Sequence, residues 1–148
     1  MTESPETDSS ARVRDIFRRQ RVMETFGATL TAVSTEGVEI RMLYREDLTQ
    51  QHGFLHAGIV STILDSACGL AALAHMPANA NVLAIEYKIN FVSPAKGDTF
   101  IARGRVVKAG RTISVCSGNV FSVTNGEEKL AATMISTMMT VINHDAKD

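Results

Sequence analysis

Residues 57–76, AGIVSTILDSACGLAALAHM, would place apolar side chains on nearly every side of a helix, and this run limits the folds open to the chain. A helix of this kind has to be buried from several directions. We therefore expect the rest of the chain to wrap around it. One carboxylate, Asp65, interrupts the run. A buried charge is costly unless it is paired or opens on a polar cavity. Asp65 is therefore either a structural residue, hydrogen-bonded to the backbone or to Ser61 one turn earlier, or a functional one.

Extended runs bounded by turn residues lie on both sides of this helix. They predict strands at residues 28–34, 38–44, 81–91, 99–108, 112–123 and 129–142. In the third strand the apolar side chains alternate with polar ones and are expected to share one face: Leu83, Ile85, Tyr87, Ile89 and Phe91. The short turns between the later strands favour antiparallel neighbours. This order predicts an α+β domain in which a curved antiparallel sheet wraps around one long central helix.

The ends of the chain and its composition add further limits. Residues 12–26 predict one amphipathic helix, whereas residues 1–10 are too polar to pack and predict a flexible tail, so that a single domain spans 11–148. The formal net charge of -1 favours neither nucleic acid nor an anionic membrane as a partner. Without a secretory signal or a membrane-spanning run, the sequence indicates a cytoplasmic protein. Cys68 and Cys116 lack metal-type spacing and indicate buried thiols rather than a disulfide.

A polar loop, residues 49–53, leads into the start of the apolar helix at His56, Ala57 and Gly58. Backbone N–H groups in the first turn of a helix have no partner within it and suit an oxyanion or a polarised carbonyl. Ala57 and Asp65 are eight residues apart, which is about 12 Å along the helix axis. A base has to act within about 3 Å of the reacting centre. Unless a loop folds back to meet Asp65, one site therefore takes the helix start of one chain and Asp65 of another, which predicts a homodimer with shared sites.

The stretches HAGIVSTILDSACG, INFVSPAKGD and RVVKAGRTISV resemble the hotdog-fold thioesterases of the phenylacetate-degradation (PaaI-like) and acyl-CoA thioesterase 13 type. The similarity spans residues 45–142. The family motif is a His-Gly-Gly turn with an Asp nine residues after the His, a spacing that His56 and Asp65 keep. The resemblance implies a hotdog fold and hydrolysis of acyl- or aryl-acyl-coenzyme A by a homodimer, often a dimer of dimers. It also implies no metal and no bound cofactor.

The resemblance also implies roles for individual residues. Asp65 matches the family's catalytic carboxylate, which acts as general base on water or as nucleophile, and the Ala57 N–H matches the oxyanion donor. Ala57 replaces the first Gly of the motif. His56 stands before it, where it orients the loop, touches the thioester or is only structural. Gln50 stands where many relatives have an Asn that holds the thioester carbonyl or the water.

Candidates for substrate contacts follow from the same resemblance. Relatives bind the phosphates and adenine of coenzyme A at the surface between subunits, and Lys96, Lys108 and Arg111 lie in or beside turns suited to this contact. Near Ala84 some relatives have a Ser or Thr that supports the carboxylate, whereas this chain has no hydroxyl there. Ser61, on the same helical face as Asp65, could substitute for it.

Three functions are compatible with these residues. The first is an acyl-CoA thioesterase. The second is an acyl-thioester hydratase or dehydratase that uses His56 and Asp65 as an acid/base pair, which their separation permits only across chains. The proline-rich loop of dehydratases is missing from the sequence. The third is a non-catalytic acyl-CoA-binding module, which the departures from the family motif would favour.

Overall fold

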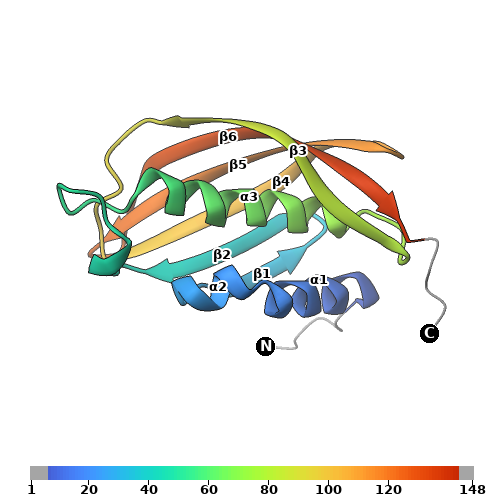
Figure 1. The fold of residues 1–148 in the computed structure, drawn as a ribbon, viewed down its shortest axis with the longest axis horizontal. Coiled ribbons are helices and arrows are strands. Elements are labelled where there is room, and N and C mark those ends of the chain that lie inside the picture. The colour runs from blue at the N-terminus through green and yellow to red at the C-terminus, as the bar shows by residue number, and fades with distance from the viewer. Residues whose placement is uncertain (1–6, 144–148) are drawn as a thin grey trace.

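The structure, a computed structural model, describes residues 7–143. Its strands form one six-stranded antiparallel sheet in the order β1-β2-β4-β5-β6-β3, which curves around the helix α3 (Figure 1). The elements are α1 (Asp8–Arg19), α2 (Arg21–Phe26), β1 (Thr29–Ser34), β2 (Gly37–Leu43), the 3-10 helix η1 (Glu46–Leu48), α3 (Ala57–Leu73), β3 (Ala80–Phe91), β4 (Thr99–Ala109), β5 (Ile113–Thr124) and β6 (Glu127–Ile142). The predicted α+β arrangement and its six strands are confirmed.

The 17-residue helix α3 forms the centre of the core. Ile63, Leu64 and Ala67 are fully buried. Strand β4 lies so close to the helix that a Cβ atom on Gly104 would come within 2.5 Å of the Ala67 carbonyl carbon, so only glycine fits at this position. The helix ends at residue 73 rather than at the predicted 76, because helices usually end before a proline, here Pro77.

The segment 12–26, predicted as one helix, forms two helices that meet at Gln20. The Gln20 backbone is extended, with φ −77° and ψ 96°, so the helical hydrogen-bond pattern is interrupted there. Helix α1 begins at Asp8, earlier than the predicted boundary, because the Thr7 side chain caps its first turn. Residues 1–6 of the predicted flexible tail lie outside the described residues.

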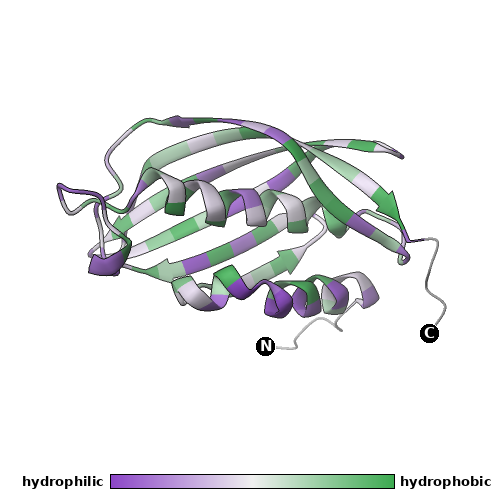
Figure 2. Ribbon diagram, viewed as in Figure 1, coloured by the Kyte–Doolittle hydropathy of each residue, from purple (hydrophilic) through white to green (hydrophobic). Residues whose placement is uncertain are grey.

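Side chains of α1 fix this helix to the C-terminal end of α3. The Arg12 guanidinium donates hydrogen bonds to the carbonyls of Leu73, Met76 and Pro77, and the Ser9 hydroxyl donates to a further carbonyl of the same turn. The end of a helix leaves such carbonyls without partners inside the helix, and a cation there also complements the helix dipole. Hydrophilic and hydrophobic positions alternate along α1, as in an amphipathic helix (Figure 2).

Within residues 7–143, no helix has the length and apolar character needed to cross a membrane.

Strand β3 lies at the edge of the sheet, and its apolar side chains do not share one face as predicted. A register shift against β6 places Ile85 in a bulge. Because a bulge adds one residue to the alternation, the side chains on either side of it change faces. Leu83 lies opposite the exposed Met139, whereas Tyr87 lies opposite the buried Ser136. The single apolar face was therefore a wrong prediction, although the strand itself is confirmed.

Candidate active site

The first turn of α3 presents one free backbone donor. His56 caps the helix, because its Nδ1 accepts a hydrogen bond of 2.8 Å from the Gly58 N–H. No described residue accepts a hydrogen bond from the Ala57 N–H. Of the two N–H groups expected as oxyanion donors, that of Gly58 is engaged and that of Ala57 is available. Since Nδ1 accepts, a neutral His56 ring carries its proton on Nε2, from which it can donate.

The polar loop before α3 is held by hydrogen bonds of its own backbone. The Gln50 N–H donates to the Phe54 carbonyl at 2.9 Å, and the Gln50 side-chain oxygen accepts from the His52 N–H. The His56 N–H donates to the Leu48 carbonyl at 3.0 Å, which fixes the loop at the helix start. The Gln50 amide nitrogen has no hydrogen-bond partner within residues 7–143. The loop that carries Gln50 is thus fixed just before the helix start, and the role of Gln50 stays a prediction.

Asp65 lies on the same helix, two turns further on. Its Oδ1 is buried and has no hydrogen-bond partner among the residues described. The Ser61 hydroxyl donates to the Ala57 carbonyl at 2.8 Å instead, so it neither holds Asp65 nor takes the place of the hydroxyl that relatives have near position 84. Burial raises the pKa of the Asp65 carboxyl. Among residues 7–143, the carboxylate therefore has no structural partner that would account for its place in the core.

Asp65 lines a cavity of about 220 Å³. The walls combine polar and apolar side chains, among them Gln20, Ser66, Leu70, Val82 and Met138. Helix α3 is continuous from Ala57 to Asp65, so the helical rise separates them by about 12 Å. One chain therefore presents the two predicted halves of a site, a free N–H and a carboxylate, at separate places.

Comparisons with known proteins identify the family. The sequence pattern of the thioesterase superfamily matches residues 52–129. The chain belongs to this superfamily. A crystal structure of a thioesterase family protein from Silicibacter pomeroyi is 50% identical, with a TM-score of 0.90, and the match covers 91% of this chain and 99% of that one. Mouse acyl-coenzyme A thioesterase 13 is 28% identical over 72% of this chain and 75% of its own length.

A thioesterase from Haemophilus influenzae, 17% identical with a TM-score of 0.81 over 100% of this chain and 97% of that one, shares the fold. The arrangement described above is thus the hotdog fold, and the chain is a thioester hydrolase. Non-catalytic binding as its only role is set aside.

The three basic residues expected to contact coenzyme A lie near opposite ends of strand β4 of this thioesterase. Lys96 precedes β4, whereas Lys108 lies in its last two residues and Arg111 follows in the turn to β5. A strand of 11 residues is about 35 Å long. All three side chains are exposed. One coenzyme A molecule cannot contact all three on a single chain, so Lys96 and the Lys108–Arg111 turn are alternative candidates within one copy.

Other nucleophiles and ligands of the thioesterase are less suited to chemistry. Cys68 and Cys116 are free and buried, as expected. Burial raises the pKa of the Cys68 thiol to about 12 and that of Cys116 to about 11, which suppresses the reactive thiolate. Within residues 7–143, no group of His, Cys, Asp or Glu side chains could hold a metal ion.

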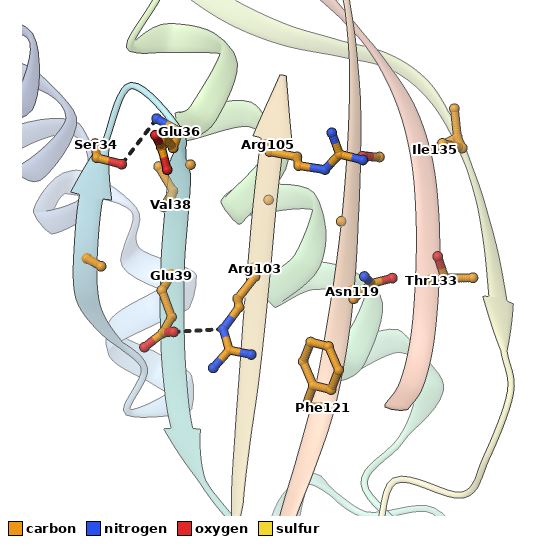
Figure 3. Close-up of a pocket in the computed structure, with 15 residues that line it drawn as sticks. Ser34, Glu36, Val38, Glu39, Arg103, Arg105, Asn119, Phe121, Thr133 and Ile135 are labelled. Atoms are coloured by element: carbon orange, nitrogen blue, oxygen red, sulfur yellow. Dashed lines mark hydrogen bonds and ion pairs between the residues drawn. The ribbon is translucent and has the colours of Figure 1, made fainter. Parts of the chain in front are cut away.

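A larger cavity, of about 630 Å³, lies on the face of the sheet opposite α3 (Figure 3). Within its lining, the Arg103 guanidinium donates to Glu39 at 2.9 Å and lies over the Phe121 ring. Arg103 also donates to Glu128, which does not line the cavity, at 2.6 Å. The hydrogen bond from Arg103 lowers the pKa of Glu128. These carboxylates are held as anions by a cation and are poor bases. The smaller cavity at Asp65 is therefore the better candidate for the reaction.

Sequence reasoning missed two residues of the Asp65 cavity. Gln20 reaches it from the joint between α1 and α2, and the Ser66 Oγ donates to the Gln20 Oε1 at 2.9 Å. Both are ordinary polar residues, Ser66 within α3 and Gln20 at the joint, and they are 46 positions apart in the sequence. No local pattern signals such a contact. A tertiary structure is needed to find it.

Proposed function

We propose that this chain hydrolyses acyl- or aryl-acyl-coenzyme A to the free acid and CoA, with Asp65 as general base or nucleophile. The observation that carries the proposal is the Asp65 carboxylate, which has a buried oxygen without a partner in the described chain and lines a cavity. A perturbed carboxylate that the fold does not use is a candidate for chemistry. The similarity to mouse acyl-coenzyme A thioesterase 13 supports a coenzyme A thioester as substrate.

In the general-base route, Asp65 takes a proton from a water molecule while the water oxygen bonds to the thioester carbonyl carbon. The Ala57 N–H, at the positive end of α3, stabilises the negative charge that develops on the carbonyl oxygen. The C–S bond then breaks, and the CoA thiolate leaves and takes up the proton. In the nucleophile route, Asp65 itself bonds to the carbonyl carbon, the C–S bond breaks and the CoA thiolate leaves. Water then hydrolyses the mixed anhydride, which releases the acid, restores the Asp65 carboxylate and supplies the proton that the CoA thiolate takes up.

His56 and Gln50 supply two further donors at the helix start. Each has one nitrogen that no described residue engages, Nε2 in His56 and the amide nitrogen in Gln50. We assign these donors to the thioester carbonyl or the attacking water. Neither side chain replaces the Ala57 N–H, which is fixed by the helix itself.

Two copies of the chain are needed to bring these parts together. Strand β3 is a 12-residue edge strand, and its apolar side chains are exposed, for example Leu83 (59%) and Ile85 (53%). A long apolar edge strand is a template for pairing with another strand. Val82 of the same strand lines the Asp65 cavity. We infer that two β3 edges pair, which would set the Asp65 of each chain beside the helix start of the other. Further pairing into a dimer of dimers stays a prediction.

The test is release of free thiol from a panel of straight-chain and aromatic acyl-CoAs by the native protein and by Asp65→Asn. The Asn variant keeps the shape of the side chain but cannot act as base or nucleophile. We expect kcat to fall at least about a hundredfold while acyl-CoA binding persists.

Asp98→Asn serves as the matched control, since Asp98 is exposed and lies away from the cavity. It should keep native kcat. Retention of most of the native kcat by Asp65→Asn would show that Asp65 has no catalytic role. If the native protein releases thiol from none of the acyl-CoAs, coenzyme A thioesters are not its substrates.

A further inference from the structure

Gln20, at the joint between α1 and α2, contacts the residue next to Asp65. Its Oε1 accepts a hydrogen bond of 2.9 Å from the Ser66 Oγ, and Gln20 and Asp65 line the same cavity. We propose that Gln20 is a specificity-determining residue: its side chain forms the wall that limits the size of the acyl group beside Asp65. This inference rests on the proposed function, because it takes the cavity to be the acyl site.

The backbone of the joint fixes Gln20 from both sides. Its N–H donates to the Phe17 carbonyl at 3.1 Å, and its carbonyl accepts from the Met23 N–H at 3.0 Å. The side chains of Phe17 and Met23 are buried in the core. Arg12, two turns earlier, fastens α1 to the end of α3. The joint is therefore an anchored part of the fold, and the Ser66 bond then sets the direction of the Gln20 side chain.

The cavity that Gln20 closes is small. Its volume, about 220 Å³, lies below the about 300–1,000 Å³ of typical small-molecule sites. Leu70, Val82 and Met138 add apolar side chains to its lining. This size fits a short or single-ring acyl group. A longer straight chain would have to displace the Gln20 side chain from Ser66.

Replacing Gln20 tests the size limit directly. Gln20→Ala removes every side-chain atom beyond Cβ and opens the wall, whereas Gln20→Met keeps almost the same length and volume without the amide. Gln20→Phe enlarges the side chain and should narrow the cavity. Glu24→Ala is the control on the neighbouring helix, since Glu24 is exposed and does not line the cavity.

The experiment measures kcat/KM for straight-chain acyl-CoAs from acetyl to dodecanoyl and for benzoyl-CoA. We expect Gln20→Ala to raise the ratio of decanoyl- to butanoyl-CoA hydrolysis at least about tenfold, because one methylene in an apolar pocket is already worth about that factor. Gln20→Met, which keeps the volume but loses the hydrogen bond from Ser66, should raise the ratio less than Gln20→Ala. Glu24→Ala should keep the native ratio within about threefold. Gln20→Phe should lower the longest acyl length that is hydrolysed.

Two failures can be told apart. If the native protein hydrolyses acyl-CoAs and Gln20→Ala, folded and active, keeps the native length profile, Gln20 does not limit the site and the proposed function stands. If the native protein hydrolyses none of them, the proposed function fails and this inference fails with it. If Gln20→Ala does not fold, Gln20→Phe tests the inference, because it should shift hydrolysis toward shorter acyl groups. An unchanged dependence of kcat/KM on acyl length in Gln20→Phe would overturn the inference.

Discussion

The Asp65 carboxylate lies in a partly buried place, where burial disfavours its charged form. Burial raises its pKa in the folded state. Below about pH 4, the pKa of an unfolded Asp, the side chain is protonated in both states and no penalty arises. Above about pH 4, the unfolded state loses the Asp65 proton before the folded state does. The free energy of unfolding therefore falls until the pH has risen past the folded pKa. We therefore expect Asp65→Asn, which is never charged, to have a higher Tm than the native protein at pH 7.

The difference in Tm between Asp65→Asn and the native protein should shrink as the pH is lowered and vanish near pH 4. Calorimetric unfolding between pH 4 and pH 8 measures it. Asp98→Asn, at an exposed aspartate, should show no such pH-dependent difference. An Asn variant less stable than the native protein at pH 7 would mean that the Asp65 charge is stabilised by a partner in the assembled protein.

Single residues of the candidate site were predictable to the extent that their signal is local. Asp65 stood out because a charge interrupts an apolar helix, and Ala57 because a helix start leaves N–H groups free. The engagement of the Gly58 N–H by His56 depends on a side-chain rotamer, which no spacing encodes. Gln20 could not be found, because its contact with Ser66 exists only after the chain has folded.

At the scale of elements, α3 and the six strands follow from local periodicity. The break at Gln20 does not, because glutamine is tolerated within helices and apolar spacing continues across the joint. The bulge at Ile85 depends on how β3 pairs with β6, which the alternation of β3 alone does not reveal. Both departures lie next to the Asp65 cavity or to the apolar edge. The sequence thus predicts the scaffold better than the site that it carries.

The contact between α1 and α3 depends on Arg12. Its guanidinium donates to the carbonyl of Leu73, the last residue of α3, and to those of Met76 and Pro77 just after it. Hydrogen bonds from a charged donor contribute about 1.5–3 kcal/mol, and several from one side chain are not additive. We expect Arg12→Ala to lower the free energy of unfolding by about 2–3 kcal/mol.

Urea unfolding measures the effect of Arg12→Ala, and Arg18→Ala provides the control on the same helix. Arg18 has only an ion pair with Asp15, and its side chain is 70% exposed. Its removal should change the unfolding free energy by less than about 0.5 kcal/mol. Equal changes in the unfolding free energy of the two variants would show that the hydrogen bonds from Arg12 to these carbonyls do not stabilise the fold.

At the scale of the whole molecule, the proposed function implies that one chain presents an incomplete site. Its free N–H and its carboxylate are about 12 Å apart on one helix, and its apolar edge strand has no described neighbour on the outer side. Both features are accounted for by a two-fold dimer in which each site takes Ala57 from one chain and Asp65 from the other. Two variants that are each inactive should then recover activity when their chains are mixed.

Asp65→Asn lacks the carboxylate, and Ala57→Pro lacks the N–H at a first helical position that tolerates proline. Each alone should be nearly inactive. In mixed dimers one of the two sites combines an intact Ala57 with an intact Asp65. After subunit exchange at equal amounts, about half of the dimers are mixed, so about a quarter of the native activity should return.

Substitutions on the surface show whether this recovery depends on β3. Ile85→Glu places a charge on the paired edge, whereas Val107→Glu places one on β4, at a residue of matching exposure (53% and 54%). Activity should not return when both inactive chains also carry Ile85→Glu, whereas it should return when both carry Val107→Glu. Sedimentation measures whether each mixture is monomeric or dimeric. If the mixed proteins stay inactive although mixed dimers form, both halves of the site lie within one chain, and a loop has to bring the helix start to Asp65.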